Sequence, residues 1–190
     1  MKKLILILLF SPIFLSAQEY SEIVDMPGKT IDQLYSSARE WFALTFKSAN
    51  DILKMDDPIA GKIIGNGSTI LVESYTAGWA KVAVDIFFNV EFIITISLKE
   101  NKYKAVISDI YIKRSYSVNS SLTDLERKPY ADYIAEKGIY KNKSNPENTK
   151  SKENRAVSIA YYNLICKTED RMKSILKSLE SKMKKSEENW

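Results

Sequence analysis

Residues 82–99 read VAVDIFFNVEFIITISLK, and this stretch decides the fold of the chain. Every second residue from Val82 to Leu98 is apolar, and most of the residues between them are polar or charged. Successive side chains of a β-strand point to opposite faces of a sheet, so the alternation predicts a strand with one buried and one solvated face. The run is longer than an average strand, and we therefore expect a bend in it or two strands in line.

The segments on either side of this run supply further strands. Residues 100–102 predict a turn, and residues 103–116 predict a strand that returns antiparallel to the first. Shorter strands are expected at residues 20–26, 52–55 and 61–72. In the last of these, the sequence Gly65-Asn66-Gly67 predicts a bulge or a sharp bend.

Two amphipathic helices flank the strands. Thr30 and Gln33 form a capping box, in which each side chain accepts a hydrogen bond from the other residue's backbone N–H, so a helix is expected after Thr30. Apolar residues recur at helical spacing from Ile31 to Phe46, and again through a long C-terminal segment, residues 154–185. The order strand, helix, four strands, helix predicts an α+β fold, with an antiparallel sheet covered on one face by both helices.

The segment between the last strand and the C-terminal helix is less regular. Within residues 117–140, Thr123 and Pro129 are candidate starts of two short helices, and Gly138 is a candidate end. Residues 141–154 are rich in Lys, Asn, Ser and Glu and contain no large apolar residue. We expect that part to be a mobile polar loop.

The N-terminus has the pattern of a secretory signal peptide. Two lysines precede an apolar stretch from Leu4 to Leu15, and the small residues Ser16 and Ala17 follow it. The stretch is shorter than the roughly 20 residues that a membrane-spanning helix needs. We therefore predict that residues 1–17 are removed, leaving residues 18–190 as a single periplasmic or secreted domain without a transmembrane anchor.

The composition excludes several classes of site. The chain has no His and a single Cys, Cys166, so catalytic triads that use His, zinc sites that use His and an internal disulfide are all excluded. Its 28 basic and 24 acidic residues give a small net charge, whereas nucleic-acid binding depends on clustered Lys and Arg. We expect no catalytic residue, no metal, no cofactor and no nucleic-acid partner.

Five aromatic residues form the main candidate site. They lie on the apolar stripe of the first helix and on the buried face of the long strand, two surfaces that should meet: Trp41, Phe42, Phe46, Phe88 and Phe92. They could line a cavity for a small apolar ligand, or they could fill the core. A cavity would favour a ligand-binding module, and a filled core would favour a protein-interaction surface.

Two groups of polar residues are further candidates. The sequence Asp56-Asp57-Pro58 favours a turn over a metal or acid–base pair. Asp85, Asn89 and Glu91 lie on the solvated face of the long strand. They could hold a cation or a polar ligand, but the simpler interpretation is a solvated face with cross-strand charge pairs.

Cys166 lies on the side of the C-terminal helix opposite the apolar stripe that begins at Val157. An exposed unpaired Cys in an exported protein indicates intermolecular pairing or a free thiol. Packing beneath residues 117–140 would instead bury it. Both alternatives stay open at the level of the sequence.

Four local strings carry a family resemblance: Tyr35 through Asp51, Ala60 through Gly67, Lys102-Tyr103-Lys104 and Ser108-Asp109. Together they resemble a family of exported bacterial proteins called domain of unknown function 4468, described as having a TATA-binding-protein-like fold. The resemblance spans residues 19–116 and implies that fold and an export route. It implies no reaction and no catalytic residue, since the family has no assigned activity, and a shared fold does not imply DNA binding.

We therefore expect an exported, non-enzymatic binding module of the cell envelope, whose partner is a small apolar ligand or another envelope protein. The alternative is a structural or protein-interaction domain without a ligand, joined through the C-terminal helix or through a Cys166-linked dimer. A third hypothesis is an enzyme that uses only carboxylates, Ser and Lys, and nothing in the residue spacing supports it.

Overall fold

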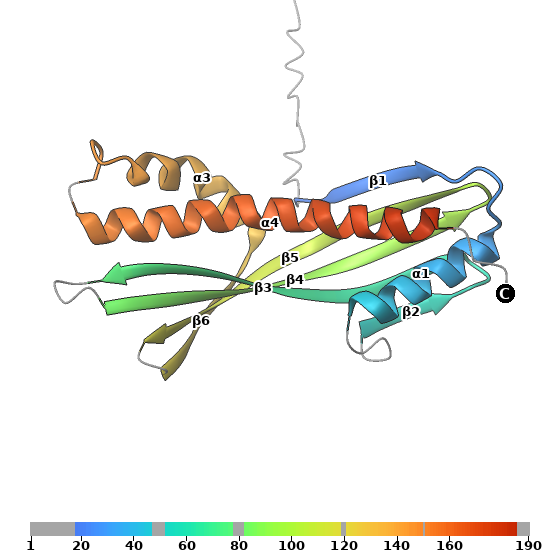
Figure 1. Cartoon of the computed structure of the whole chain (residues 1–190), viewed down its shortest axis with the longest axis horizontal. Helices are drawn as coiled ribbons and strands as arrows, with labels where there is room; N and C mark the ends of the chain where they lie inside the picture. Colours follow the sequence, from blue (N-terminus) through green and yellow to red (C-terminus); the bar gives the residue numbers. More distant parts are fainter. Residues whose placement is uncertain (1–17, 47–51, 78–81, 119–120, 150, 186–190) are drawn as a thin grey trace, which may run out of the picture.

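The computed structural model describes residues 18–46, 52–77, 82–118, 121–149 and 151–185. These residues form six strands and three helices (Figure 1). The strands are β1 (Tyr20–Asp25), β2 (Leu53–Asp57), β3 (Lys62–Ala77), β4 (Val82–Lys99), β5 (Lys102–Val118) and β6 (Ser121–Pro129). The helices are α1 (Ile31–Thr45), α3 (Tyr130–Ser144) and α4 (Lys152–Lys184). The expected signal peptide, residues 1–17, lies outside the described residues.

The strands form one antiparallel sheet in the order β1-β5-β4-β3-β2, with β6 also paired to β5. β4 is central and forms the expected hairpin with β5. β1 and β6 lie end to end along the outer edge of β5, because β1 pairs with residues 102–107 and β6 with residues 111–118. On the opposite edge, β2 pairs with β3 only through residues 62–65. In the described part of the chain, the rest of β3 therefore has no strand on its outer side.

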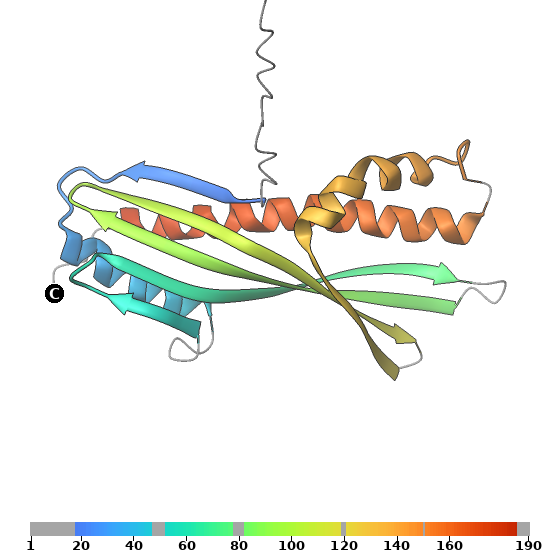
Figure 2. The ribbon, with the colours of Figure 1, turned by 180° about the vertical axis from the view of Figure 1, so that it is seen from behind.

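Helices α1 and α4 cover one face of this sheet, and the reverse view shows the strands in front of both helices (Figure 2). The capping box at Thr30 is present at the start of α1. Trp41 of α1 donates from Nε1 to Oγ of Ser178 on α4 over 3.0 Å, which ties the two helices together. The buried side chains of β4 are the even-numbered ones that the alternation predicts: Val84, Ile86, Phe88, Val90, Phe92, Ile94, Ile96 and Leu98. The predicted α+β fold, with both helices on one face, is confirmed.

Helix α3 packs along α4 through tyrosines. The Tyr130 hydroxyl donates to the backbone carbonyl of Ile165 over 2.8 Å, and burial raises the pKa of Tyr130, so the hydroxyl stays protonated. The rings of Tyr133 and Tyr140 stack on Tyr161 of α4, with centroids 6.0 and 4.9 Å away. Among the described residues, no helix is both long enough and apolar enough to span a membrane.

Residues 117–140 differ from the sequence-based expectation. The helix expected to begin at Thr123 is instead strand β6, and a single helix, α3, follows it with Pro129 at its N-cap. Pairing with β5 stabilises β6, and this long-range contact is invisible to local propensity. Gly138 lies inside α3 and does not end it.

The predicted loop at residues 141–154 is also shorter than expected. Residues 141–144 form the last turn of α3, and α4 begins at Lys152. The Ser151 side chain caps α4 by accepting from the backbone N–H of Asn154 over 3.3 Å. Polar composition alone could not separate a loop from the two helix ends that flank it.

The two glycines of β3 allow close packing. A bulge or sharp bend was predicted at Gly65-Asn66-Gly67, and an irregularity is present there only in the pairing with β2, whose register shifts between Leu53 and Met55, opposite Gly65 and Ile64. β3 pairs with β4 without a register shift over its whole length. A Cβ atom at Gly65 would lie 2.6 Å from Cε1 of Phe42, and one at Gly67 would lie 2.2 Å from Cε2 of Phe92. The missing side chains leave room for these two rings to lie directly on the strand.

Another irregularity, a bulge, lies where β4 pairs with β5. The register shifts between Glu91 and Ile93, which lie opposite Tyr111 and Ser108. Asp109 in the bulge has φ of 50°, a left-handed conformation that Asp adopts more readily than most residues. The buried positions of β5 change from odd to even numbers at this point: Tyr103, Ala105 and Ile107 before it, Ile110 and Ile112 after it.

Gly67→Ala should lower the free energy of unfolding by about 1–3 kcal/mol, because an extra methyl group would overpack the contact between β3 and Phe92. Gly138→Ala is the matched control, since nothing lies within 4 Å of a Cβ atom there. Ala is also the better helix former, so the control should be neutral or slightly stabilising. Urea unfolding followed by circular dichroism measures both. A Gly67→Ala midpoint equal to wild type would contradict the close approach of Phe92.

Candidate functional site

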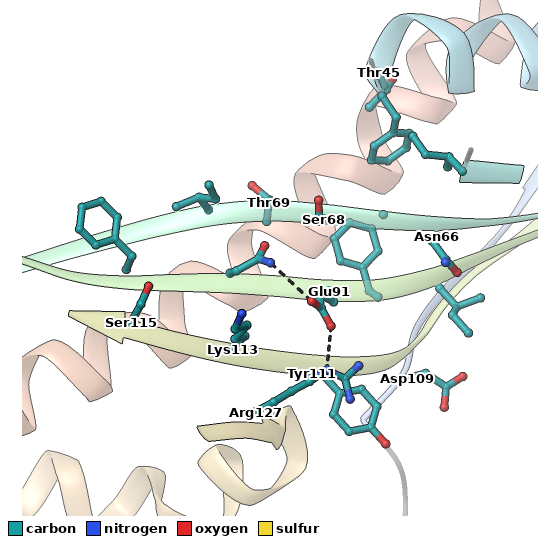
Figure 3. A pocket seen from close by; sticks show the side chains of 18 residues that line it. Thr45, Asn66, Ser68, Thr69, Glu91, Asp109, Tyr111, Lys113, Ser115 and Arg127 are labelled. Atoms are coloured by element: carbon teal, nitrogen blue, oxygen red, sulfur yellow. Dashed lines mark hydrogen bonds and ion pairs between the residues drawn. The ribbon is translucent and has the colours of Figure 1, made fainter. Parts of the chain in front are cut away.

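A large groove lies on the face of the sheet that carries no helix. Its volume is about 1430 Å³. Side chains from β3, β4 and β5 line it, Arg127 of β6 closes one side, and Thr45 marks the end nearest α1 (Figure 3). The helices bury one face of β4 and leave the groove on the other.

Strand register places the central residues of this groove. β4 contributes three of them from its solvated positions, and β5 contributes the three that lie opposite. The groove floor, as we use the term below, consists of Phe87, Asn89, Glu91, Ser115, Lys113 and Tyr111. The bulge at Asp109 is essential to this arrangement, because it turns Tyr111, Lys113 and Ser115 toward the open face.

Arg127 organises the polar centre of the floor. Its Nε lies 2.8 Å from Oε2 of Glu91, and its guanidinium carbon lies 3.9 Å from the centroid of the Tyr111 ring. Asn89 donates from Nδ2 to Oε1 of Glu91 over 3.5 Å. The Arg127 and Glu91 side chains are 50% and 35% exposed, so this ion pair adds only about 0–1 kcal/mol to stability. Both charged groups remain accessible to a bound partner.

An apolar strip borders the floor on the β3 side. Ile70 and Val72 are 63% and 44% exposed. Val72 lies directly opposite Phe87 of the floor, and Ile70 lies opposite Asn89. The open face therefore combines an apolar strip with charged and hydrogen-bonding groups.

The five predicted aromatic residues do not line one cavity. Trp41, Phe42 and Phe46 pack edge to face or tilted, with ring centroids 5.0 to 5.9 Å apart. Phe46 reaches Phe92 at 6.5 Å, and these two residues border one end of the groove. Phe88 packs elsewhere, against Tyr161 of α4 at 5.9 Å. All five side chains are buried, so this region is filled core with one end at the groove.

The two groups of polar candidate residues lie in different parts of the structure, and Asp56 and Asp57 lie outside the groove. Asp57 accepts from the backbone N–H of Ala60 over 2.9 Å, which is turn chemistry as predicted. Asp56 receives a hydrogen bond from the Tyr35 hydroxyl and lies 3.0 Å from Arg39. Burial, and next the hydrogen bond to Asp56, raise the pKa of Tyr35 to about 12. These contacts anchor α1 to β2.

Of the three polar residues on β4, two lie in the groove floor. Asn89 and Glu91 are there, whereas Asp85 lies further along the strand and accepts from the Ser74 hydroxyl over 2.6 Å. Within the described residues, no group of three or more Cys, Asp or Glu side chains is placed to hold a metal ion.

Cys166 is a half-buried free thiol. Its position is intermediate between the exposed and buried alternatives that the sequence left open. Nearby on α4, Lys167 forms an ion pair with the buried Glu73 of β3, and Asn163 donates to Glu73 over 3.4 Å. This side of α4 is therefore tied to the sheet.

Sequence reasoning missed Tyr111 and Arg127 as groove residues. The signal for Tyr111 was present: the apolar positions of β5 change phase between Ile107 and Ile110, which indicates a bulge. Arg127 was assigned to a helical region, and only the pairing of β6 with β5 brings it opposite Lys113.

Phe42→Ala should cost about 3–5 kcal/mol of unfolding free energy, because the ring is fully buried in the aromatic core. Arg127→Gln is the comparison from the open face and should cost less than about 1 kcal/mol. Chemical denaturation of both variants tests whether the aromatic residues form a packed core. A mild effect of Phe42→Ala would show that the aromatic region is loosely packed and could admit a ligand.

Comparison with known proteins gives a family and a fold. Residues 20–113 match the family described as "Domain of unknown function (DUF4468) with TBP-like fold". The chain is similar to a TBP-like protein from Parabacteroides distasonis, with a TM-score of 0.53, 13% identity and coverage of 89% of this chain and 96% of the other. It is also similar to a DUF4468 family protein from Bacteroides ovatus, with a TM-score of 0.49, 15% identity and coverage of 91% and 90%.

No curated protein matches the chain. At 13% identity, the likeness to the P. distasonis structure establishes the fold alone. The family recognised from the sequence strings is confirmed by the match over residues 20–113. Through that segment, the chain belongs to the DUF4468 family with TBP-like fold.

Proposed function

We propose that this protein is an exported, non-enzymatic binding module of the cell envelope, and that the groove floor binds an extended segment of a polypeptide partner. The observation that carries the proposal is the contrast between the two faces of β4. One face is filled by buried side chains, whereas the other is open and lined by chemically diverse groups.

The size of the groove supports a polypeptide partner. Sites for small molecules usually measure about 300–1,000 Å³ and enclose most of the ligand. This groove is about 1430 Å³ and lies open along three strands. The aromatic core offers less support for the alternative of a small apolar ligand, because its rings pack against one another.

The chemistry of the floor supports a partner with mixed character. Lys113 and Arg127 provide positive charge, and Glu91 and Asp109 provide negative charge. The balance of signs does not suit a polyanion such as nucleic acid. An extended peptide carries backbone donors and acceptors, charges of both signs and apolar side chains, and these fit the floor and its apolar strip.

Export is part of the proposal and is supported by the signal-peptide pattern of residues 1–17. The non-enzymatic assignment is supported by the absence of His and the single Cys in the sequence. The half-buried position of Cys166 gives less support to a disulfide-linked dimer as the main function.

A photo-crosslinking amino acid in place of Phe87 tests this function in living cells that produce the protein. We expect a discrete polypeptide adduct, identified by mass spectrometry. The control position is Ile59, which is 99% exposed in the turn between β2 and β3 and should give none. With the purified partner, Phe87→Ala should weaken binding about tenfold or more, as expected for an aromatic anchor.

Two outcomes would count against the proposal. Equal adducts from the Phe87 and Ile59 positions would show that the groove is not selective. A bound small molecule without a polypeptide adduct would favour the ligand-binding alternative.

A further inference from the structure

Arg127 is the side chain of the groove best placed to select the partner. Its Nε donates to Oε2 of Glu91 over 2.8 Å, and its guanidinium lies over the Tyr111 ring at 3.9 Å (Figure 3). The ring supports the flat face of the guanidinium, and the carboxylate holds one of its edges. These two contacts orient the group before any partner binds.

The remaining edge of this guanidinium is available to a partner. Among the residues that the structure describes, neither Nη atom has a hydrogen-bond partner, and the Arg127 side chain is 50% exposed. Glu91 already accepts from Arg127 and from Nδ2 of Asn89. The cluster therefore offers donors, and the planar fork of an arginine matches a carboxylate through two parallel N–H···O bonds.

The charges around Arg127 favour the same ligand. Lys113 lies directly opposite Arg127 in the register of β5 and β6 and belongs to the groove floor. Like charges at one cross-strand pair repel each other, and a carboxylate bound there reduces the repulsion. Asp109, the other acidic residue of the lining, accepts from the Ser108 hydroxyl over 3.1 Å.

The shape of the groove sets the direction of a bound segment. Along β4 the lining runs from Phe87 to Ile93, which spans about 20 Å at the rise of a β-strand. Across the sheet it runs from β3 to β6, which is about 14 Å at the usual spacing of strands. An extended segment therefore fits best when it runs along β4.

Two anchor points lie along this direction. The Arg127 guanidinium lies beside Glu91, whereas Phe87 lies four residues away on the same face of β4, with the 44% exposed Val72 opposite it. Four residues of a strand span about 13 Å, and side chains four positions apart in an extended partner also point to one face. A partner can therefore reach both anchor points with residues four positions apart.

Within the polypeptide-binding function proposed above, on which this inference rests, we propose that the groove selects segments with an acidic residue four positions from an apolar one. The Nη atoms of Arg127 bind the carboxylate, and Phe87 with Val72 binds the apolar side chain. The carboxylate belongs to a side chain and not to the end of the partner. The groove continues beyond Arg127 to Ile93 and Phe46, and a segment bound by its C-terminus would leave that part empty.

Selection of peptides from a random dodecapeptide library displayed on phage, with the purified protein as bait, tests the proposal. Wild type should enrich peptides in which an acidic residue lies four positions from a large apolar one. Arg127→Gln should lose the acidic preference and keep the apolar one, whereas Phe87→Ala should do the reverse. Lys104→Gln is the matched control and should select as wild type does, because Lys104 is an exposed cation of β5 outside the groove lining.

Calorimetry with a selected peptide, synthesised with an amidated C-terminus, measures the contribution of the carboxylate. Arg127→Gln should weaken binding about tenfold or more, as expected for the loss of hydrogen bonds to a charged group. Replacing the acidic residue of the peptide by its amide should weaken binding to wild type by the same factor. The same replacement should have little effect on binding to Arg127→Gln, because the two groups act as a pair.

Selected peptides without the acidic residue at this spacing would overturn the inference, as would an acidic preference that Arg127→Gln retains. Both outcomes would leave polypeptide binding intact. Binding that requires a free C-terminal carboxylate would also overturn it, by assigning Arg127 to the end of a chain. If wild type enriches no peptide at all, polypeptide binding itself is contradicted, so the two failures are distinguishable.

Discussion

The two-sidedness of β4 is the constraint on which the rest of the structure depends. Its even-numbered residues from Val84 to Leu98 are buried on the side of α1 and α4, so its odd-numbered residues must face the other way. A shift of one residue would move the whole set of buried apolar side chains to the open face. The register of β3 and β5 is thus fixed by burial on the helix side, and the groove floor is assembled as a consequence of packing on the opposite face.

Two glycines in β3 and a bulge in β5 shape the two faces of the sheet. Gly65 and Gly67 let Phe42 and Phe92 lie directly on β3, which closes the aromatic core. The bulge at Asp109 reverses the alternation of β5 and so directs Tyr111 and Lys113 to the groove. The five aromatic side chains are buried and pack as core, which is one of the two alternatives that the sequence left open. The accessible space lies on the opposite face, where the sequence favoured a solvated surface with charge pairs.

Much of the fold could be predicted from the sequence because its signals are local. The alternation in β4, the capping box at Thr30 and the stripe of α4 each lie within one element. β6 could not be predicted, since its stability comes from pairing with β5 and its own sequence resembles a helix start. For the same reason Arg127 was missed, although Asn89 and Glu91 were correctly placed on the open face. The role of the glycines was also non-local, because it depends on rings contributed by α1 and β4.

Hydroxyl-radical footprinting of the open face, compared between intact producing cells and purified protein, tests the central claim most directly. The account predicts that Phe87 and Tyr111 are oxidised in the purified protein and protected in cells, while the buried Phe42 and Phe88 are protected in both. Equal oxidation of Phe87 and Tyr111 in cells and in purified protein would contradict the claim that this face is a binding surface.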